Sequence, residues 1–143
     1  NLITINIQAV RQKARNAKRR ADIISVQAPL EVYYDAQIPK TYPNTITWWG
    51  TCSGYGSHDV TGSSGWIPNL APTYIKRLPS DPSPADPNRC YLYKSDGANY
   101  KIISFNPQDD GAVLNDPKDI LYDPIRPTSA WMVCSGEPAC STW

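Results

Sequence analysis

No proline or glycine occurs in the first 28 residues, although the chain of 143 residues contains 14 prolines and eight glycines. These two residues are the ones that most often interrupt a helix, and the segment is rich in alanine, arginine, lysine and glutamine, which favour one. The first proline is Pro29. We therefore predict one long helix from near Leu2 to about Asp35. It should be kinked at Pro29, because proline removes a backbone donor and crowds the carbonyl four residues earlier.

Charge is distributed as unevenly as proline. Residues 1–21 carry six basic side chains and no acidic one, whereas the rest of the chain carries eight basic and 13 acidic groups. The formal net charge of +1 therefore conceals a basic helix joined to an acidic body. The six cations are Arg11, Lys13, Arg15, Lys18, Arg19 and Arg20.

The predicted helix is too long for a compact body of this size. About 35 residues rise roughly 50 Å in a helix, whereas a compact chain of this length has a radius of gyration of about 14–15 Å. The first half of the helix should therefore project beyond the body.

One stripe of this helix consists mainly of small residues. Its members recur at intervals of three and four residues and are Val10, Ala14, Ala17, Ala21 and Ile24. Small side chains let another helix approach closely, so we predict that this stripe packs against neighbouring subunits. The alternative is an amphipathic helix packed entirely on its own body. A second stripe, made of Ile23, Val26, Leu30 and Tyr33, continues past the proline.

After Pro39 the sequence changes to short strand-like runs separated by turn residues. The runs 90–94 and 100–105 flank an Asp-Gly turn and predict a β-hairpin. The runs 45–49 and 129–134 are further candidate strands. One long helix followed by an antiparallel sheet predicts an α+β roll. Its parts are a helix over residues 1–38 and a globular α+β head over residues 39–143.

Four cysteines in a small, turn-rich chain indicate two disulfides formed in an oxidising compartment. They contain no Cys-x-x-Cys pair, and the chain has a single histidine, so a zinc site is not expected. Three pairings are open. We favour Cys52 with Cys90 and Cys134 with Cys140, because the second pair closes a short loop of turn residues.

Nothing in the sequence points to an enzyme. It holds one histidine and two glutamates and lacks the common nucleophile, phosphate-loop and zinc-protease motifs. His58 lies in a loop rich in glycine and serine, where a solvated or packing role is expected.

Two kinds of ligand remain as alternatives. The six cations of the helix could neutralise the phosphates of DNA, although no aromatic residue lies between them for stacking. The five tryptophans could bind a carbohydrate or another surface ligand. Trp48 and Trp49 are adjacent in a predicted strand and should point to opposite faces. At most one should lie in the core, and the other, with Tyr55 or Trp143, is a candidate adhesive or subunit-contact residue.

The order of these elements resembles that of type IV pilins and of the pseudopilins of type II secretion systems. The stretches that resemble a pilin helix, its exit, the segment before the sheet and the first hairpin are 21–34, 40–43, 74–82 and 91–104, and 129–143 is also pilin-like. In these families about two dozen mostly apolar residues precede this part of the helix, cross the inner membrane and later pack in the filament core. The resemblance implies that such a segment precedes Asn1.

The resemblance also implies a function and a location. It predicts a pilin-like roll and a structural subunit of a type IV pilus-like filament that polymerises through its N-terminal helix, for adhesion, motility or DNA uptake. The implied partners are further copies of the chain, other pilins, the inner membrane and the pilus assembly machinery, with DNA or a surface ligand as a further partner. The subunit would be anchored in the inner membrane before assembly and then lie at the bacterial cell surface. We expect the basic helix of one subunit to lie beside the acidic heads of others.

A major pseudopilin of a type II secretion system, located in the periplasm, is the alternative within this class. The loop bounded by Cys134 and Cys140 resembles type IV pilins, whereas major pseudopilins often bind calcium in the acidic loop after the hairpin. The corresponding oxygen-bearing residues here are Asp109, Asp110, Asn115, Asp116 and Asp119. They lack EF-hand spacing, and ordinary solvated turns are the alternative. No other cofactor is expected.

Overall fold

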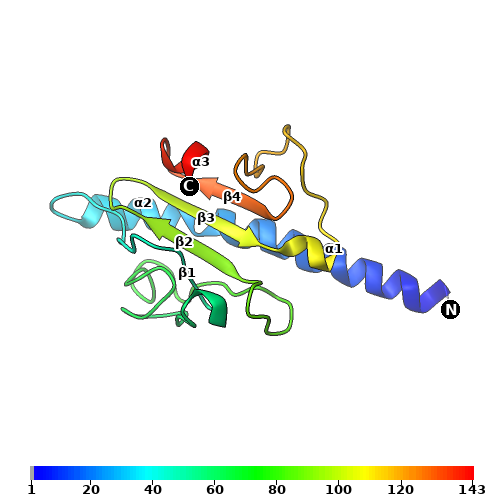
Figure 1. The fold of residues 1–143 in the computed structure, drawn as a ribbon. Helices are drawn as coiled ribbons and strands as arrows, with labels where there is room; N and C mark the ends of the chain where they lie inside the picture. The colour runs from blue at the N-terminus through cyan, green and yellow to red at the C-terminus, as the bar shows by residue number, and fades with distance from the viewer. Residues whose placement is uncertain (1) are drawn as a thin grey trace.

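A computed structural model describes residues 2–143, with side chains from residue 6 onward. The predicted α+β class is confirmed: a long N-terminal helical region lies along one face of a four-stranded antiparallel sheet (Figure 1). The elements are α1 (Leu2–Ser25), α2 (Gln27–Ala36), β1 (Trp49–Gly50), η1 (Ser53–Tyr55), β2 (Tyr91–Ser95), β3 (Tyr100–Phe105), η2 (Pro107–Asp110), β4 (Ala130–Cys134) and α3 (Ala139–Thr142). Among these described residues, no helix is both long enough and apolar enough to cross a membrane.

The helical region is interrupted at Val26, three residues before the proline that causes the interruption. Pro29 lies in the first turn of α2, where its missing N–H would have had no partner within the helix. Its ring crowds the carbonyl four residues earlier, which belongs to Ser25, the last residue of α1. The N–H of Leu30 donates to the carbonyl of Val26 at 3.2 Å and continues the chain into α2. The helical region is therefore interrupted one turn before Pro29, and the kink itself stays a prediction.

The sheet has the strand order β1-β2-β3-β4. Strands β2 and β3 form the predicted hairpin, with Tyr91 opposite Ser104 and Ser95 opposite Tyr100. In the connecting loop Gly97 has a φ of 92°, a conformation that glycine adopts without a steric penalty. The carboxylate of Asp96 accepts the N–H groups of Ala98 and Asn99, which closes the loop.

The strand predicted over 45–49 is mostly absent. Only Trp49 and Gly50 pair with β2, and Ile46 has a φ of 61°. The side-chain oxygen of Asn44 accepts the N–H of Ile46 at 3.1 Å, a local turn that competes with strand pairing. This turn holds the segment beside the hairpin, since the N–H of Ile46 also donates to the carbonyl of Ser95.

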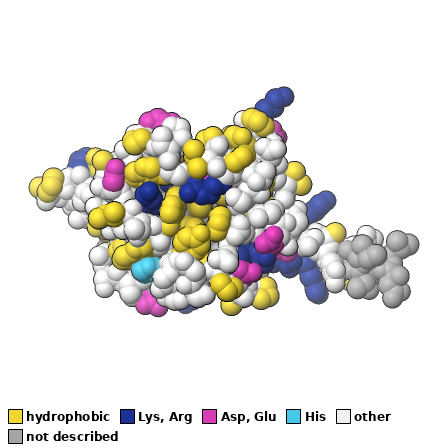
Figure 2. Space-filling model, viewed as in Figure 1, with side chains coloured by type: hydrophobic (Ala, Val, Ile, Leu, Met, Phe, Trp, Pro, Cys, Tyr) yellow, Lys and Arg dark blue, Asp and Glu magenta, His cyan; other side chains and the backbone are white. Residues whose placement is uncertain are grey.

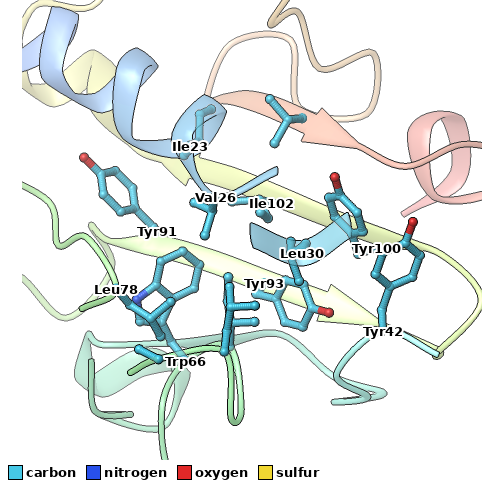
Figure 3. Packing of buried hydrophobic residues seen from close by; sticks show 14 of the residues in the cluster. Ile23, Val26, Leu30, Tyr42, Trp66, Leu78, Tyr91, Tyr93, Tyr100 and Ile102 are labelled. Atoms are coloured by element: carbon cyan, nitrogen blue, oxygen red, sulfur yellow. The ribbon is translucent and has the colours of Figure 1, made fainter. Parts of the chain in front are cut away.

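The main core lies between the helical region and the sheet. The second helix stripe supplies Ile23, Val26 and Leu30, each with 0% of its surface exposed. Figure 3 shows these side chains pointing toward Ile102 and toward a group of tyrosines, with Trp66 and Leu78 on the other side of the cluster. A smaller apolar cluster covers the opposite face of the sheet and contains Cys52, Cys90, Leu92, Ile103 and Ala130.

Both predicted disulfides are present. Cys52 joins Cys90 and so ties the segment after β1 to the start of β2. Cys134 joins Cys140 and closes the short loop between β4 and α3.

Candidate functional site

The stripe predicted for subunit packing lies on the solvent side of α1. All five members, Val10, Ala14, Ala17, Ala21 and Ile24, are exposed, and we call them the exposed stripe. Val10 is 64% exposed and Ile24 is 43% exposed. At about 3.6 residues per turn this stripe lies roughly half a turn from the face that carries Asn16, Arg19 and Ile23, which is buried against the head. The helix therefore has one face held by its own head and an opposite face, made largely of alanine, that is open to solvent.

The N-terminal part of α1 extends beyond the sheet (Figure 1). Where α1 first meets the head, buried charges make the contact. Arg19 is 0% exposed and donates to the carboxylate of Asp81 through two nitrogens, each bond 2.9 Å long, and to Asp110 at 2.8 Å. Arg15 donates twice to Asp110, both times at 2.6 Å. Asn16 donates to the backbone carbonyl of Asp110 and accepts from Arg19, so the polar atoms of this cluster satisfy one another. We call Arg15, Asn16, Arg19, Asp81 and Asp110 the arginine cluster.

The arginine cluster holds its carboxylates in the charged form. The hydrogen bond from Arg15, helped by Arg19, lowers the pKa of Asp110 to about 2. Burial alone would raise the pKa of Asp81, but the hydrogen bonds from Arg19 and Ser83 outweigh it and lower that pKa. Both acids lie in irregular segments, Asp81 in the proline-rich loop and Asp110 at the end of η2. The cluster therefore fastens two loops of the head to one side of α1.

Two further cations of α1 also find partners within the chain. Arg20 donates to both carboxylate oxygens of Asp119, at 2.6 and 3.0 Å, and lies over the ring of Trp131. Lys18 pairs with Asp22 one turn away. Arg11 and Lys13 take part in no ion pair among the residues described. The structure thus pairs four cations of the basic helix inside one molecule, and the expected contact of this helix with the acidic heads of neighbours stays a prediction.

The residues predicted to bind calcium are largely engaged elsewhere. Asp110 and Asp119 bind arginines of α1, and Asp109 lies 3.5 Å from Arg89. One oxygen of Asp116 accepts the N–H of Lys118 in a turn, and Asn115 has a φ of 65°. Within the described part of the chain, no three acidic, histidine or cysteine side chains gather as a metal site would require. Calcium binding at this loop stays a prediction.

The adjacent tryptophans lie in different surroundings, although only Trp49 belongs to a strand. Trp49 stacks on His58, with ring centroids 3.9 Å apart, which gives that histidine a packing role. Trp48 packs on the apolar cluster of the opposite sheet face, as Tyr55 does. Both tryptophans are half-buried. Trp48 and Tyr55 therefore share one surface, on the side of the sheet away from α1.

Comparison of the chain with protein-family models, with curated proteins and with solved structures gave no match.

Proposed function

We propose that this chain is a structural subunit of a type IV pilus-like filament and that it polymerises through α1. The observation that carries the proposal is the exposed stripe on the side of α1 opposite the head. Alanine side chains let a second helix approach closely, because interhelical distance depends on the size of the side chains at the contact. A helix that is bound to its head on one face and exposes small side chains on the other is suited to pack beside copies of itself.

The way in which α1 is held supports this role. The arginine cluster and the apolar contacts of Ile23 fix one face of α1, so the projecting part continues a firmly anchored helix. We propose that the partners are further copies of this chain and other pilins, with an apolar N-terminal segment in the inner membrane before assembly. The finished filament would lie at the bacterial cell surface. We propose no catalytic role for the chain.

A major pseudopilin remains the alternative within this class. Its distinguishing feature would be calcium in the loop over 109–119. Because Asp110 and Asp119 already bind arginine side chains, we favour the pilus subunit. A rise in melting temperature on changing from EDTA to millimolar calcium would reverse this preference.

Replacing Ala17 by arginine tests the proposal. Ala17 is exposed and arginine is a good helix former, so the isolated chain should keep its stability within about 0.5 kcal/mol. In the organism that encodes the chain, the same change in the complete gene should abolish surface filaments counted by electron microscopy. Ala36→Arg is the matched control, because Ala36 is also exposed but lies at the end of α2, outside the stripe. Filaments as abundant with Ala17→Arg as with Ala36→Arg would overturn the proposal.

The gene upstream of Asn1 offers a second test. We expect it to encode an apolar run of about 20 residues after a short basic leader. A globular extension in this place would contradict the filament proposal.

A further inference from the structure

Two tryptophans and two cations form a compact cluster on the sheet face turned away from α1. The ammonium group of Lys94 in β2 lies 5.0 Å from the ring centroid of Trp143 and 6.0 Å from that of Trp48. The guanidinium carbon of Arg126 lies 4.9 Å from the centroid of the Trp48 ring. All four side chains are half-buried, so each keeps part of its surface open to solvent. We call Trp48, Lys94, Arg126 and Trp143 the outer aromatic cluster.

The cluster lies within a larger apolar surface. Trp48, Tyr55, Phe105 and Met132 are partly buried and pack on the apolar residues of this sheet face. Figure 2, viewed from the side of the sheet, shows hydrophobic side chains gathered over the middle of the molecule around Lys and Arg side chains. This surface is separate from the exposed stripe, which lies on α1 behind the sheet (Figure 1).

Three cations, Lys94, Lys101 and Arg126, and the buried carboxylate of Asp123 meet beside the two tryptophans. The carboxylate of Asp123 is 0% exposed and already engaged, because Lys101 lies 2.9 Å from one of its oxygens and Arg126 lies 3.4 Å from the other. Lys101 and Arg126 also donate to the main-chain oxygen of Trp143, the last residue, at 2.8 and 2.9 Å. These contacts hold Arg126 and Trp143 in place, and they direct the carboxylate of Asp123 at Lys101 and Arg126 rather than at Lys94.

Lys94 itself makes no ion pair and donates no hydrogen bond among the residues that the structure describes. Its ammonium group is held between two indole rings by the attraction between a cation and an aromatic face. The nearest acid along the strand, Asp96, points its carboxylate at the backbone N–H groups of the hairpin loop. Glu137 is exposed and hydrogen-bonds to Ser141. The three donor hydrogens of Lys94 are therefore available to an anion from solution.

We propose that the outer aromatic cluster binds the carboxylated sugar units of an acidic polysaccharide. Lys94 and the free donors of Arg126 would hold the carboxylate, and charge-assisted hydrogen bonds of this type are the strong ones. The indole of Trp48 or Trp143 would contact the apolar face of the sugar ring. This inference depends on the outer sheet face alone and does not require the chain to form filaments.

The same contacts argue against a nucleic acid as the ligand. A phosphate backbone needs a row of several free cations, whereas this surface offers Lys94 and part of Arg126. The basic helix does not extend the row, because Arg15, Lys18, Arg19 and Arg20 bind carboxylates of the same chain. A uronate needs a single anion contact beside an aromatic ring, which is what the cluster provides.

Titration of the whole chain with three oligomers tests the proposal. The probes are a hexamer of galacturonate, a neutral hexamer of glucose and a single-stranded oligodeoxythymidine, each measured at low salt by calorimetry and by tryptophan fluorescence. We expect the galacturonate hexamer to bind and to change the fluorescence, and the neutral hexamer to bind at least about tenfold more weakly. Equal binding of the neutral hexamer, or tighter binding of the DNA, would overturn the proposal.

Lysine variants assign the binding to the cluster. Lys94→Gln should weaken galacturonate binding about tenfold, the loss expected when one charge-assisted hydrogen bond is removed, and Lys94→Arg should restore most of it. Lys76→Gln is the matched control, because it removes the same charge from an exposed residue that lies outside the cluster. Its affinity should stay within about twofold of that of the unchanged chain. An equal loss for Lys94→Gln and Lys76→Gln would show that only net charge matters and would refute the site. Thermal melting checks that each variant is folded.

Discussion

The head holds its N-terminal helix in two different ways. Around Ile23 the contact is made by hydrocarbon, with side chains that are 0% exposed and close-packed against the sheet. One turn earlier it is made by charge, with Arg19 equally buried but bound to Asp81 and Asp110. An apolar contact loses little when pH or salt changes, whereas a buried charge cluster depends on every member keeping its charge. The two turns of α1 should therefore respond differently to the same perturbations.

The largest loss of stability should appear when Arg19, the central residue of the arginine cluster, is replaced. Arg19→Met leaves the carboxylates of Asp81 and Asp110 short of a partner in a buried site, and we expect a loss of about 3–5 kcal/mol in the free energy of unfolding. Arg11→Met is the control, since Arg11 is exposed and forms no ion pair among the described residues. It should change stability by less than about 0.5 kcal/mol. Urea denaturation measures both, and a loss for Arg19→Met no larger than that of the control would show that the arginine cluster contributes little.

The apolar turn offers a matched pair of adjacent residues. Ile23 is 0% exposed and Ile24 is 43% exposed, so the same substitution removes a core contact in one case and part of the exposed stripe in the other. Ile23→Ala should cost about 2–4 kcal/mol, through lost burial and the cavity left behind. Ile24→Ala should cost less than about 1 kcal/mol. The loss for Ile23→Ala should also be the same in acid as at neutral pH, and a strong pH dependence would contradict the comparison.

A contact of this fold could be predicted from the sequence when its residues recur with the period of a helix or a strand. The α+β class, the hairpin and β4 follow from local patterns, as does the second stripe that carries Ile23, because periodicity in a helix or a strand records which face is buried. The cysteine pairing followed from the short spacing of Cys134 and Cys140, and the structure confirms it. A kink was predicted at Pro29, and the helical region is interrupted one turn earlier, at Val26.

The arginine cluster was not visible, and the reason is physical. Arg19 lies 62 residues from Asp81 and 91 from Asp110, and both acids lie outside regular strands, so no period relates them to α1. The only signal was the unopposed run of cations on the helix, which we interpreted as a surface for DNA or for the acidic heads of neighbouring subunits. The strand predicted over 45–49 failed for a related reason. Its residue types favour a strand, but a side-chain turn at Asn44 redirects the backbone at Ile46.

Acid should weaken the charged turn selectively. The pKa of Asp110 in the folded chain, about 2, lies below its unfolded value, so its contribution is fully present above the unfolded pKa. That contribution is lost as the pH falls through the folded value, and the lowered pKa of Asp81 acts in the same direction. Between about pH 5 and about pH 2 the unchanged chain should therefore lose about 1 kcal/mol more stability than Asp110→Asn, a figure reduced for solvent screening. Urea denaturation across this range measures the difference, and parallel curves for the two proteins would contradict it.

The smallest loss of stability should come from breaking the ion pair between Arg20 and Asp119 at the edge of the head. Its comparison with the buried pair of Arg19 and Asp81 separates the effect of burial from the effect of charge. Arg20 binds Asp119 through two nitrogens, as Arg19 binds Asp81, but the side chains of Arg20 and Asp119 are 34% and 21% exposed, against 0% and 5% for the buried pair. Arg20→Gln should cost about 0.5–1 kcal/mol at low salt, and the loss should shrink at high salt because exposed charges are screened. The loss for Arg19→Met should change little with salt, since its partners are shielded from solvent. Denaturation of both variants at two salt concentrations provides the measurement. If the two losses fell in parallel as salt rose, the arginine cluster would behave as a surface feature, and the distinction between the charged and the apolar turn of α1 would no longer hold.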